Sequence, residues 1–356
     1  MFTAVVAFLI YGYQSIFGVP IAQQIDRYLS TEQFQGAVLV AQAGKVILCK
    51  GYGYANLEHK IPNCPSTVFR IGSITKQFTA VAILQLQEQG LLHVHDPVEK
   101  FLPGYPHGNE ITIHHLLTHT SGLAEITDFP NLSTIQRLPS TPETVIAYLH
   151  DLPLEFPPGT CCTYCNSGYI VLGAIIETVT GLSYERYLHE QVFTPLHLAA
   201  TDYDLPEKVI PHRAHGYRVT KNTLAHAEFI DMSFPHASGG LASSIEDLYA
   251  WNTALHAGKL LSPQSLNAMF SQQSANAKGT LTYGYGVCIG PHNQGLTDTL
   301  GPVTGHFGSI EGFRSALIYY PEADITLVIL SNHENTNVRS LQHHLSSLFS
   351  QASSWR

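Results

Sequence analysis

The sequence predicts an α/β (α+β) fold in which helices flank one antiparallel sheet built from both ends of the chain. Two β-hairpin patterns, one near each end, and a series of helical patterns between them lead to this prediction. The 356 residues are 44% hydrophobic and 13% charged, which suits one large core or two lobes that share a core. The net charge of −9 comes without a basic cluster, which argues against a nucleic-acid partner.

The first hairpin pattern joins Ala37–Gln42 to Val46–Gly51, with a turn at Gly44. The second joins Phe313–Tyr320 to Ile325–Asn332 through a Pro-Glu-Ala-Asp turn. Because the two hairpins lie at opposite ends of the chain, we expect them to share one sheet.

Between the hairpins the patterns are mostly helical. Residues Ile170–Thr180 are apolar all round, which is typical of a buried helix. Ser243 and Glu246 have the spacing of a capping box for a helix that runs to Gly258. Ser262-Pro263 opens another helix. After the second hairpin, four apolar residues lie on one face of a predicted final helix: Leu341, Leu345, Leu348 and Phe349.

These elements predict a single domain over residues 22–356. Its α/β lobe would comprise about residues 22–95 and 280–356, with a mostly helical lobe, about residues 96–279, inserted between them. No linker, repeat or low-complexity run separates the two lobes.

Residues 1–21 form a candidate signal or leader segment. Ala4–Ile10 is continuously apolar, but a preceding Lys or Arg is missing and the cleavage site is poor. A buried or wrongly assigned N-terminus is the alternative, so the pattern only slightly favours export, periplasmic or secreted, over a cytoplasmic location. No stable membrane span is expected, because Tyr11, Gln14 and Ser15 interrupt the short apolar run.

The six cysteines permit disulfides if the protein is exported. Cys162 and Cys165 have the spacing of a metal or redox pair, but no second pair of ligands follows at matching spacing. We favour ordinary buried thiols over a thiol or metal protein.

The first chemical signal is Ser73-Ile74-Thr75-Lys76, at the start of a predicted helix that runs to Gly90. That helix is apolar on nearly every side, so Ser73 and Lys76 would be carried into the interior on one face. A serine needs an adjacent base, and a buried lysine with a lowered pKa can serve as one. Taken alone, however, the tetrapeptide favours a helix-capping serine with an exposed lysine, because such a match is expected about once by chance in a chain this long.

Two further segments change this assessment. Tyr164-Cys165-Asn166 precedes the predicted buried helix, and His306-Phe307-Gly308-Ser309 precedes the last hairpin. Each is common by chance, but their order along the chain is informative.

With these segments the chain resembles the penicillin-recognising serine hydrolases, which include class C β-lactamases, D,D-carboxypeptidases and related esterases and aminopeptidases. The segments "FRIGSITKQFTAVAILQLQEQGLLHVHDPVEKFLP", "ITIHHLLTHTSGL", "PPGTCCTYCNSGYIVLGAIIE", "GGLASSIEDLYAW" and "GHFGSIEGFRSALIYYP" follow that family's order, from about Gly36 to Asn332. The resemblance implies a β-lactamase/penicillin-binding transpeptidase-like fold.

The resemblance also implies a role for each site residue. Ser73 would be acylated, and Lys76 and Tyr164 would share the proton transfers, with either as the general base. Asn166 would orient Lys76 and bind the substrate amide, and the backbone N–H groups of Ser73 and Ser309 would form the oxyanion hole. No metal or organic cofactor is implied.

The third motif departs from the family pattern. Where β-lactamases have Lys-Thr-Gly, this chain has His306-Phe307-Gly308. A mostly neutral histidine would hold a substrate carboxylate less strongly, unless Arg314 or another cation substitutes. The resemblance still implies that His306, Gly308 and Ser309 contact the substrate. If His306 must be neutral for activity, the activity should fall below about pH 6.

The predicted function is a serine hydrolase that acts on a small-molecule or peptide substrate through an acyl-enzyme. The bond cleaved would be an amide, peptide or ester, and a cell-wall peptide is one candidate substrate. The alternatives are a true β-lactamase and a non-catalytic scaffold or binding member that keeps the fold. Glu311 and Arg314 are expected to form an exposed ion pair, or else to shape the substrate pocket.

Overall fold

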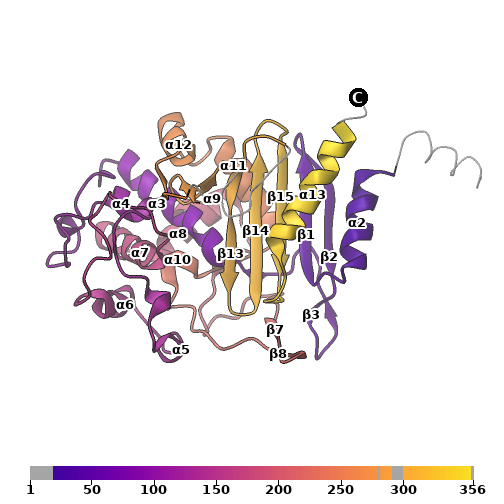
Figure 1. Cartoon of the computed structure of the whole chain (residues 1–356), viewed down its shortest axis with the longest axis horizontal. Coiled ribbons are helices and arrows are strands. Elements are labelled where there is room, and N and C mark those ends of the chain that lie inside the picture. Colours follow the sequence, from indigo (N-terminus) through magenta and orange to yellow (C-terminus); the bar gives the residue numbers. More distant parts are fainter. Residues whose placement is uncertain (1–18, 279–280, 291–299, 354–356) are drawn as a thin grey trace, which may run out of the picture.

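A computed structural model describes residues 19–278, 281–290 and 300–353 and confirms the predicted mixed α/β class (Figure 1). Its main feature is an eight-stranded antiparallel sheet. In spatial order the strands are β10 (Ser274–Ala275), β11 (Thr282–Tyr283), β12 (Cys288–Ile289), β13 (Thr304–Ile310), β14 (Phe313–Tyr320), β15 (Ile325–Ser331), β1 (Gly36–Gln42) and β2 (Lys45–Tyr52).

Both ends of the chain contribute to this sheet, as predicted. Strand β1 pairs with β15 in a register that sets Ala37 opposite Leu330 and Gln42 opposite Ile325. The two predicted hairpins are present as β1–β2 and β14–β15. The central strands β14, β15 and β1 are buried almost throughout, because helices cover both faces.

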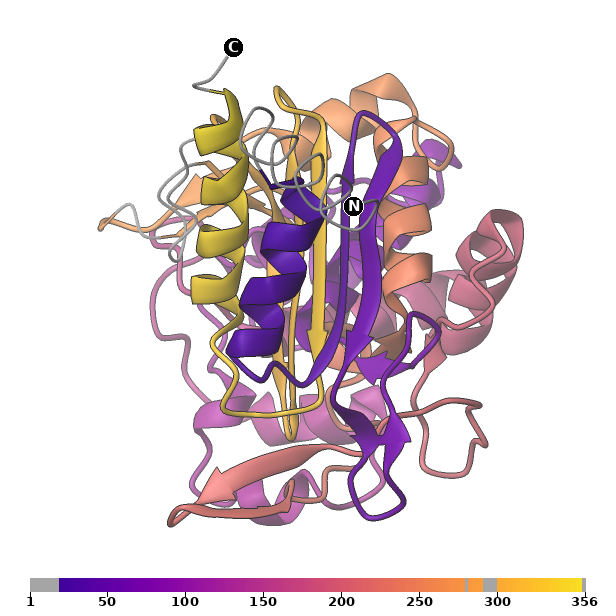
Figure 2. The same ribbon diagram turned by 90° about the vertical axis from the view of Figure 1, so that its right-hand side faces the viewer.

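Helices α2 (Ile21–Thr31) and α13 (Val338–Ser353) lie side by side on one face of the sheet (Figure 2). The Tyr28 and His344 rings stack between them with their centroids 3.6 Å apart. Helix α11 (Ile245–His256) contacts β1 and β15. The expected apolar face of α13 is confirmed, since Leu341, Leu345 and Phe349 are buried.

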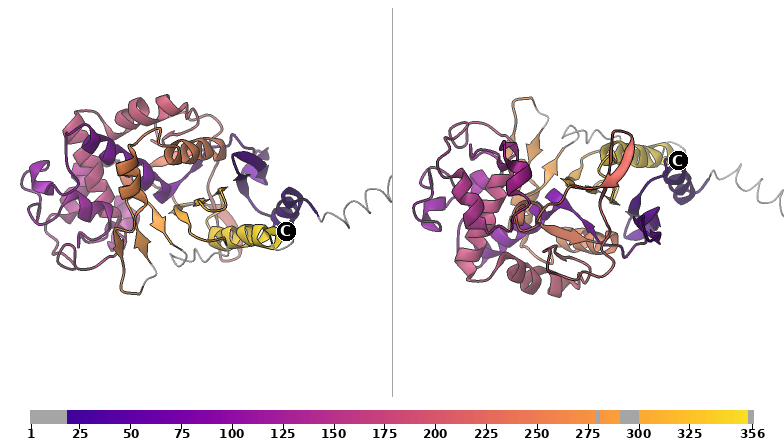
Figure 3. Two further views of the ribbon diagram at one scale, coloured as in Figure 1. Left: turned by 90° about the horizontal axis from the view of Figure 1, so that it is seen from above. Right: turned by 90° about the horizontal axis from the view of Figure 1, so that it is seen from below.

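Apart from α11, the helices between the two halves of the sheet gather at one end of the molecule (Figure 3). They are α3 (Thr75–Glu88), α4 (Ile113–Leu117), α5 (Leu132–Ile135), α6 (Pro142–Leu149), α7 (Asn166–Thr180), α8 (Tyr184–Leu188), α9 (Thr194–Leu196), α10 (His236–Gly239) and α12 (Pro263–Phe270). Short helical turns are η1 (Gly72–Ile74), η2 (Val98–Lys100), η3 (Ile126–Asp128) and η4 (His189–Phe193). The division into two lobes, with its boundaries near residues 95 and 280, stays a prediction.

Three small sheets complete the fold. They are β3 (Tyr54–Asn56) with β4 (Ile61–Pro62), β5 (Phe69–Arg70) with β9 (Leu241–Ser243) and β6 (Asp202–Tyr203), and β7 (Tyr217–Thr220) with β8 (Thr223–His226).

One predicted helix cap was wrong by one residue. The hydroxyl of Ser244, rather than Ser243, accepts a hydrogen bond from Asp247 N at the start of α11, and that helix ends at His256. Ser243 instead belongs to β9, where its hydroxyl lies 2.8 Å from Thr201 Oγ1. The predicted cap at Ser262 is confirmed, and α7 ends at Gly181 in a left-handed conformation.

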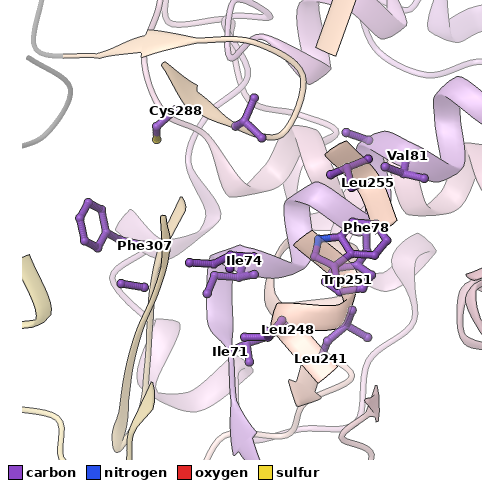
Figure 4. Packing of buried hydrophobic residues seen from close by; sticks show 14 of the residues in the cluster. Ile71, Ile74, Phe78, Val81, Leu241, Leu248, Trp251, Leu255, Cys288 and Phe307 are labelled. Atoms are coloured by element: carbon purple, nitrogen blue, oxygen red, sulfur yellow. The ribbon is translucent and has the colours of Figure 1, made fainter. Parts of the chain in front are cut away.

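Helix α3 lies in the centre of the hydrophobic core. Phe78 stacks on Trp251 of α11 with a centroid distance of 3.8 Å (Figure 4). Because every residue of α3 from Thr75 to Leu84 is buried, the start of this helix is held rigidly.

Of the candidate leader, residues 1–21, the first 18 residues lie outside the described part of the chain. None of the helices in the described part of the chain is long and apolar enough to cross a membrane.

Candidate active site

Ser73 lies in η1, between β5 and α3, where neighbouring strands hold the chain on both sides. The backbone N–H of Ile71 donates to Leu241 O at 3.0 Å, and the hydroxyl of Ser315 donates to Ile71 O at 2.7 Å. Gly72 follows with φ +50°, a conformation that favours glycine. Ser73 is therefore fixed between β9 and the β13–β14 part of the main sheet, and it is half-buried.

Lys76 lies one turn later, in the first turn of α3, and is 0% exposed. Its Nζ donates to Asn166 Oδ1 at 2.7 Å and to Ser238 O at 2.8 Å, and lies 3.1 Å from Ser73 Oγ. The interpretation as a capping serine with an exposed lysine is therefore wrong. Ser73 and Lys76 share one buried face, as predicted.

Burial lowers the pKa of Lys76 to about 7, although the nearby Glu125 carboxylate raises it. A neutral lysine has two N–H donors and one lone pair. With the donors on Asn166 and Ser238, the lone pair is directed at Ser73 Oγ. This geometry suits a base that removes the hydroxyl proton of Ser73.

Tyr164 packs beside the same lysine, with Lys76 Nζ 4.9 Å from the centre of its ring. Among the described residues its buried hydroxyl has no hydrogen-bond partner. Burial raises the pKa of Tyr164 well above its usual value, while a hydrogen bond to Ser73 would lower it. Tyr164 is thus held as a protonated phenol, and which of the two predicted bases acts stays a prediction.

His119 supports Tyr164 from the opposite side. The two ring centroids are 4.4 Å apart, and His119 Nδ1 accepts a hydrogen bond from Cys165 N at 3.1 Å. Burial holds the pKa of His119 well below its usual value, so the ring is neutral.

Asn166 is the first residue of α7 and joins Lys76 to Glu125. Its Oδ1 accepts from Lys76, and its Nδ2 donates to Glu125 Oε1 at 3.0 Å. The predicted contact between Asn166 and Lys76 is thus present.

His306 lines the second hollow beside Ser73, and its expected contact with substrate stays a prediction. It is only 3% exposed, its Nδ1 donates to Phe307 O at 2.6 Å, and its Nε2 accepts from the Tyr283 hydroxyl at 2.8 Å. Both ring nitrogens are occupied by the protein, and burial lowers the pKa of His306 to about 3. The expected loss of activity below pH 6 through His306 is therefore corrected: this ring is neutral across that range and forms a wall of the site.

Gly308 and Ser309 bring β13 against η1. A Cβ on Gly308 would lie 2.0 Å from Ile71 O, and one on Gly72 would lie 2.9 Å from Ser309 N. This close approach sets the backbone of Ser309 beside that of Ser73, as an oxyanion hole requires.

Two hollows border Ser73. The first, about 260 Å³, has a mixed lining: Ile126, Ile170 and Phe234 contribute apolar surface, and charged side chains line another part of it. The second, about 580 Å³, is lined by Tyr164, Phe307 and Arg339, among others. The Arg339 guanidinium lies over the Phe307 ring, 4.1 Å from its centre.

Glu311 and Arg314 both line the first hollow. Arg314 Nη1 donates to the backbone oxygens of Phe313 at 2.8 Å and Ile310 at 3.2 Å. Among the described residues the two side chains form no ion pair within 4.0 Å, so the expected exposed pair was wrong and the pocket alternative is supported.

The six thiols are free, and Cys162, Cys165 and Cys288 are buried. Within the described ranges no group of three or more His, Cys, Asp or Glu side chains could hold a metal ion. Cys165 packs under the site, where its Sγ lies 3.5 Å from Leu123 O.

Sequence reasoning missed Glu125, Tyr283, Arg339 and the carbonyl of Ser238. Each reaches the site from a distant segment and belongs to no short motif. A carboxylate just after the "THTSGL" segment was the one available signal, for Glu125.

Known proteins resemble this chain over most of its length. The protein flp of Staphylococcus aureus (strain N315) is 30% identical over 341 residues, which cover 91% of this chain and 65% of that protein. This chain therefore spans slightly less than two thirds of flp.

Two solved structures are similar over nearly the whole chain. The octameric penicillin-binding protein homologue from Pyrococcus abyssi has 31% identity and a TM-score of 0.77, covering 94% of this chain and 76% of that chain. A D-stereospecific amidohydrolase from Streptomyces sp. has 26% identity and a TM-score of 0.76, covering 90% and 97%.

The fold and the site thus define a protein of the penicillin-binding-protein-like class. The Beta-lactamase family profile matches residues 21–346, and the chain belongs to that family, whose members are generally serine hydrolases.

Proposed function

We propose that this protein is a serine hydrolase that cleaves an amide, peptide or ester through an acyl-enzyme on Ser73. One observation carries the proposal: the buried Lys76 amine lies 3.1 Å from Ser73 Oγ, while Asn166 and Ser238 occupy its two other hydrogen-bonding directions. A non-catalytic scaffold has no need for a lysine buried at this cost.

In acylation, neutral Lys76 takes the hydroxyl proton as Ser73 Oγ attacks the substrate carbonyl. The charge that develops on the carbonyl oxygen is held by the backbone N–H groups of Ser73 and Ser309. As the tetrahedral intermediate collapses, Tyr164 gives its proton to the leaving nitrogen or oxygen and takes one from Lys76. Water then attacks the ester, the acid is released, and Ser73 regains its proton.

The two hollows suggest how a substrate lies. The apolar part of the first hollow, at Ile126, Ile170 and Phe234, fits a hydrophobic side chain on the acyl side, and the second hollow accepts the leaving group. Arg339 brings a positive charge to the second hollow, where a leaving group with a free carboxylate would be favoured. This is the kind of substitute cation that the loss of the motif lysine requires.

We favour a peptidase or amidase over a β-lactamase. His306 is buried, and Phe307 lacks the hydroxyl of the usual threonine, so a β-lactam carboxylate has fewer partners here. The Streptomyces relative, named as a D-stereospecific amidohydrolase, supports substrates built from D-amino acids. Export would give such an enzyme access to cell-wall peptides.

A substrate panel tests this proposal. Purified protein is assayed with D- and L-phenylalanine amides, matching esters, dipeptides ending in a free carboxylate or a carboxamide, and a chromogenic cephalosporin. We expect turnover of amides, peptides or esters, slow turnover of the β-lactam, and none by Ser73→Ala. Arg339→Gln should raise KM for the carboxylate dipeptide more than for its carboxamide. Absence of all turnover, or equal turnover by Ser73→Ala, would refute the proposal.

A further inference from the structure

Glu125, just before η3, contacts Asn166 at two points. Its Oε1 accepts from Asn166 Nδ2 at 3.0 Å, and its Oε2 accepts from the backbone N–H of Asn166. Thr127 adds its N–H at 3.0 Å and its hydroxyl at 2.7 Å, both donating to Oε1. Four donors therefore surround one carboxylate, which ties η3 to the first residue of α7.

This contact determines which way round the Asn166 amide lies. A carboxylate can only accept, so it selects the NH₂ end of the amide. The oxygen end is then left for Lys76 Nζ, at 2.7 Å. The reversed amide would set two acceptors together at Glu125 and two donors together at Lys76, and both hydrogen bonds would be lost.

We propose that Glu125 is a positioning residue for acylation: its carboxylate holds the Asn166 amide oxygen on Lys76, and so keeps the lysine lone pair on Ser73. This inference rests on the proposed function, because it concerns the same lysine. Glu125 acts through Asn166 and Lys76, and so adds a further layer of support to the site.

Glu125 also influences the charge of Lys76. Its carboxylate favours the protonated lysine and raises the pKa of Lys76 against the effect of burial. The other titratable groups that face or influence Lys76 are Cys165, Cys288, Tyr164, Tyr169, His119 and His306. Removing the carboxylate should therefore let Lys76 lose its proton at lower pH.

The test measures the labelling rate of Ser73 by an uncharged fluorophosphonate from pH 5 to 9, with the whole chain. In Glu125→Gln the amide brings a donor against donors, so the rate at the plateau should fall about 10- to 100-fold. The acid limb of the profile, where the labelling rate rises with pH, should also lie at lower pH than in the wild type. A purely structural defect lowers the plateau and leaves the limb in place.

Two further variants sharpen the result. Glu125→Asp keeps the charge but shortens the reach, so its plateau should fall while its acid limb stays near that of the wild type. Asp128→Asn removes the same charge from an exposed residue of the same turn. It should match the wild type in both respects, and circular dichroism checks that each variant is folded.

The outcomes separate the two proposals. A wild type that is not labelled at Ser73 refutes the proposed function. If the wild type is labelled at Ser73 and its acid limb coincides with that of Glu125→Gln, the role of Glu125 is refuted and the proposed function stands. If the glutamine variant does not fold, Glu125→Asp decides, and an unchanged plateau in that variant overturns the inference.

Discussion

Lys76 is useful as a base only when it carries no proton, and its surroundings bring that condition within reach of neutral pH. Full burial penalises the charged form and lowers the pKa to about 7, whereas an exposed lysine stays charged to beyond pH 10. The same burial raises the pKa of Tyr164, which keeps the phenol protonated as a donor for the leaving group.

The acylation rate should therefore rise with pH through about 7. Below this pH Lys76 holds its proton and cannot accept that of Ser73, and above it the rate should reach a plateau. His306, with its pKa lowered to about 3, cannot produce such a limb. Labelling by an uncharged fluorophosphonate between pH 5 and 9 gives the profile, and a rate that is flat over this range would contradict the role of Lys76.

Individual site residues could be predicted from the sequence wherever they belong to a short motif. Ser73, Lys76, Tyr164 and Asn166 meet as expected because their spacing places each at or just before the start of a buried helix. His306 shares the expected position but lies in the wall, because Tyr283 and its own neighbour satisfy both ring nitrogens. No local sequence pattern around His306 reveals that Tyr283, from another strand, bonds its ring.

Strand β13 and turn η1 meet backbone to backbone, and we propose that this contact assembles the oxyanion hole. Gly308 makes the approach possible, because a side chain there would overlap Ile71 O and lie 2.2 Å from Ser315 Oγ. The contact between β13 and η1 therefore requires a residue without a Cβ at position 308.

Gly308→Ala should destabilise the protein by about 1–3 kcal/mol and reduce acylation, because β13 must move away from η1. Thermal unfolding and the labelling rate measure the two effects. Gly168→Ala is the matched control: its added Cβ lies in α7 and would meet Leu116 O at an ordinary 3.4 Å. Equal stability and labelling of both variants would show that the close approach does not matter.

Hairpins and apolar helices could be predicted because their patterns are local. The predicted start of α7, at Ile170, was late because Asn166 to Tyr169 begin the helix with polar or small residues. Their place there is fixed by contacts across the fold, such as Ser167 Oγ donating to Ala124 O at 2.7 Å. The misplaced cap of α11 has a similar cause, since two adjacent serines fit the pattern and β9 takes the first.

Across the whole molecule, the site lies where the sheet meets the helical part. Ser73 comes from η1 and Lys76 from the first turn of α3, Tyr164 and Asn166 come from the start of α7 and the residues before it, and Ser309 comes from β13 of the sheet. The pairing of β1 with β15 holds the two ends of the chain together and so fixes these segments relative to one another. The fold class followed from the two hairpins, whereas the lining of the two hollows depends on contacts between distant segments.

The most direct test of this account is intact-mass spectrometry of the wild type and Ser73→Ala after incubation with a fluorophosphonate. We predict one adduct on the wild type and none on the variant, with both proteins folded. Such a result would show that Ser73 is the activated serine among all the others in the chain. A wild type without an adduct, or an adduct that persists in Ser73→Ala, would contradict an acyl-enzyme mechanism at Ser73.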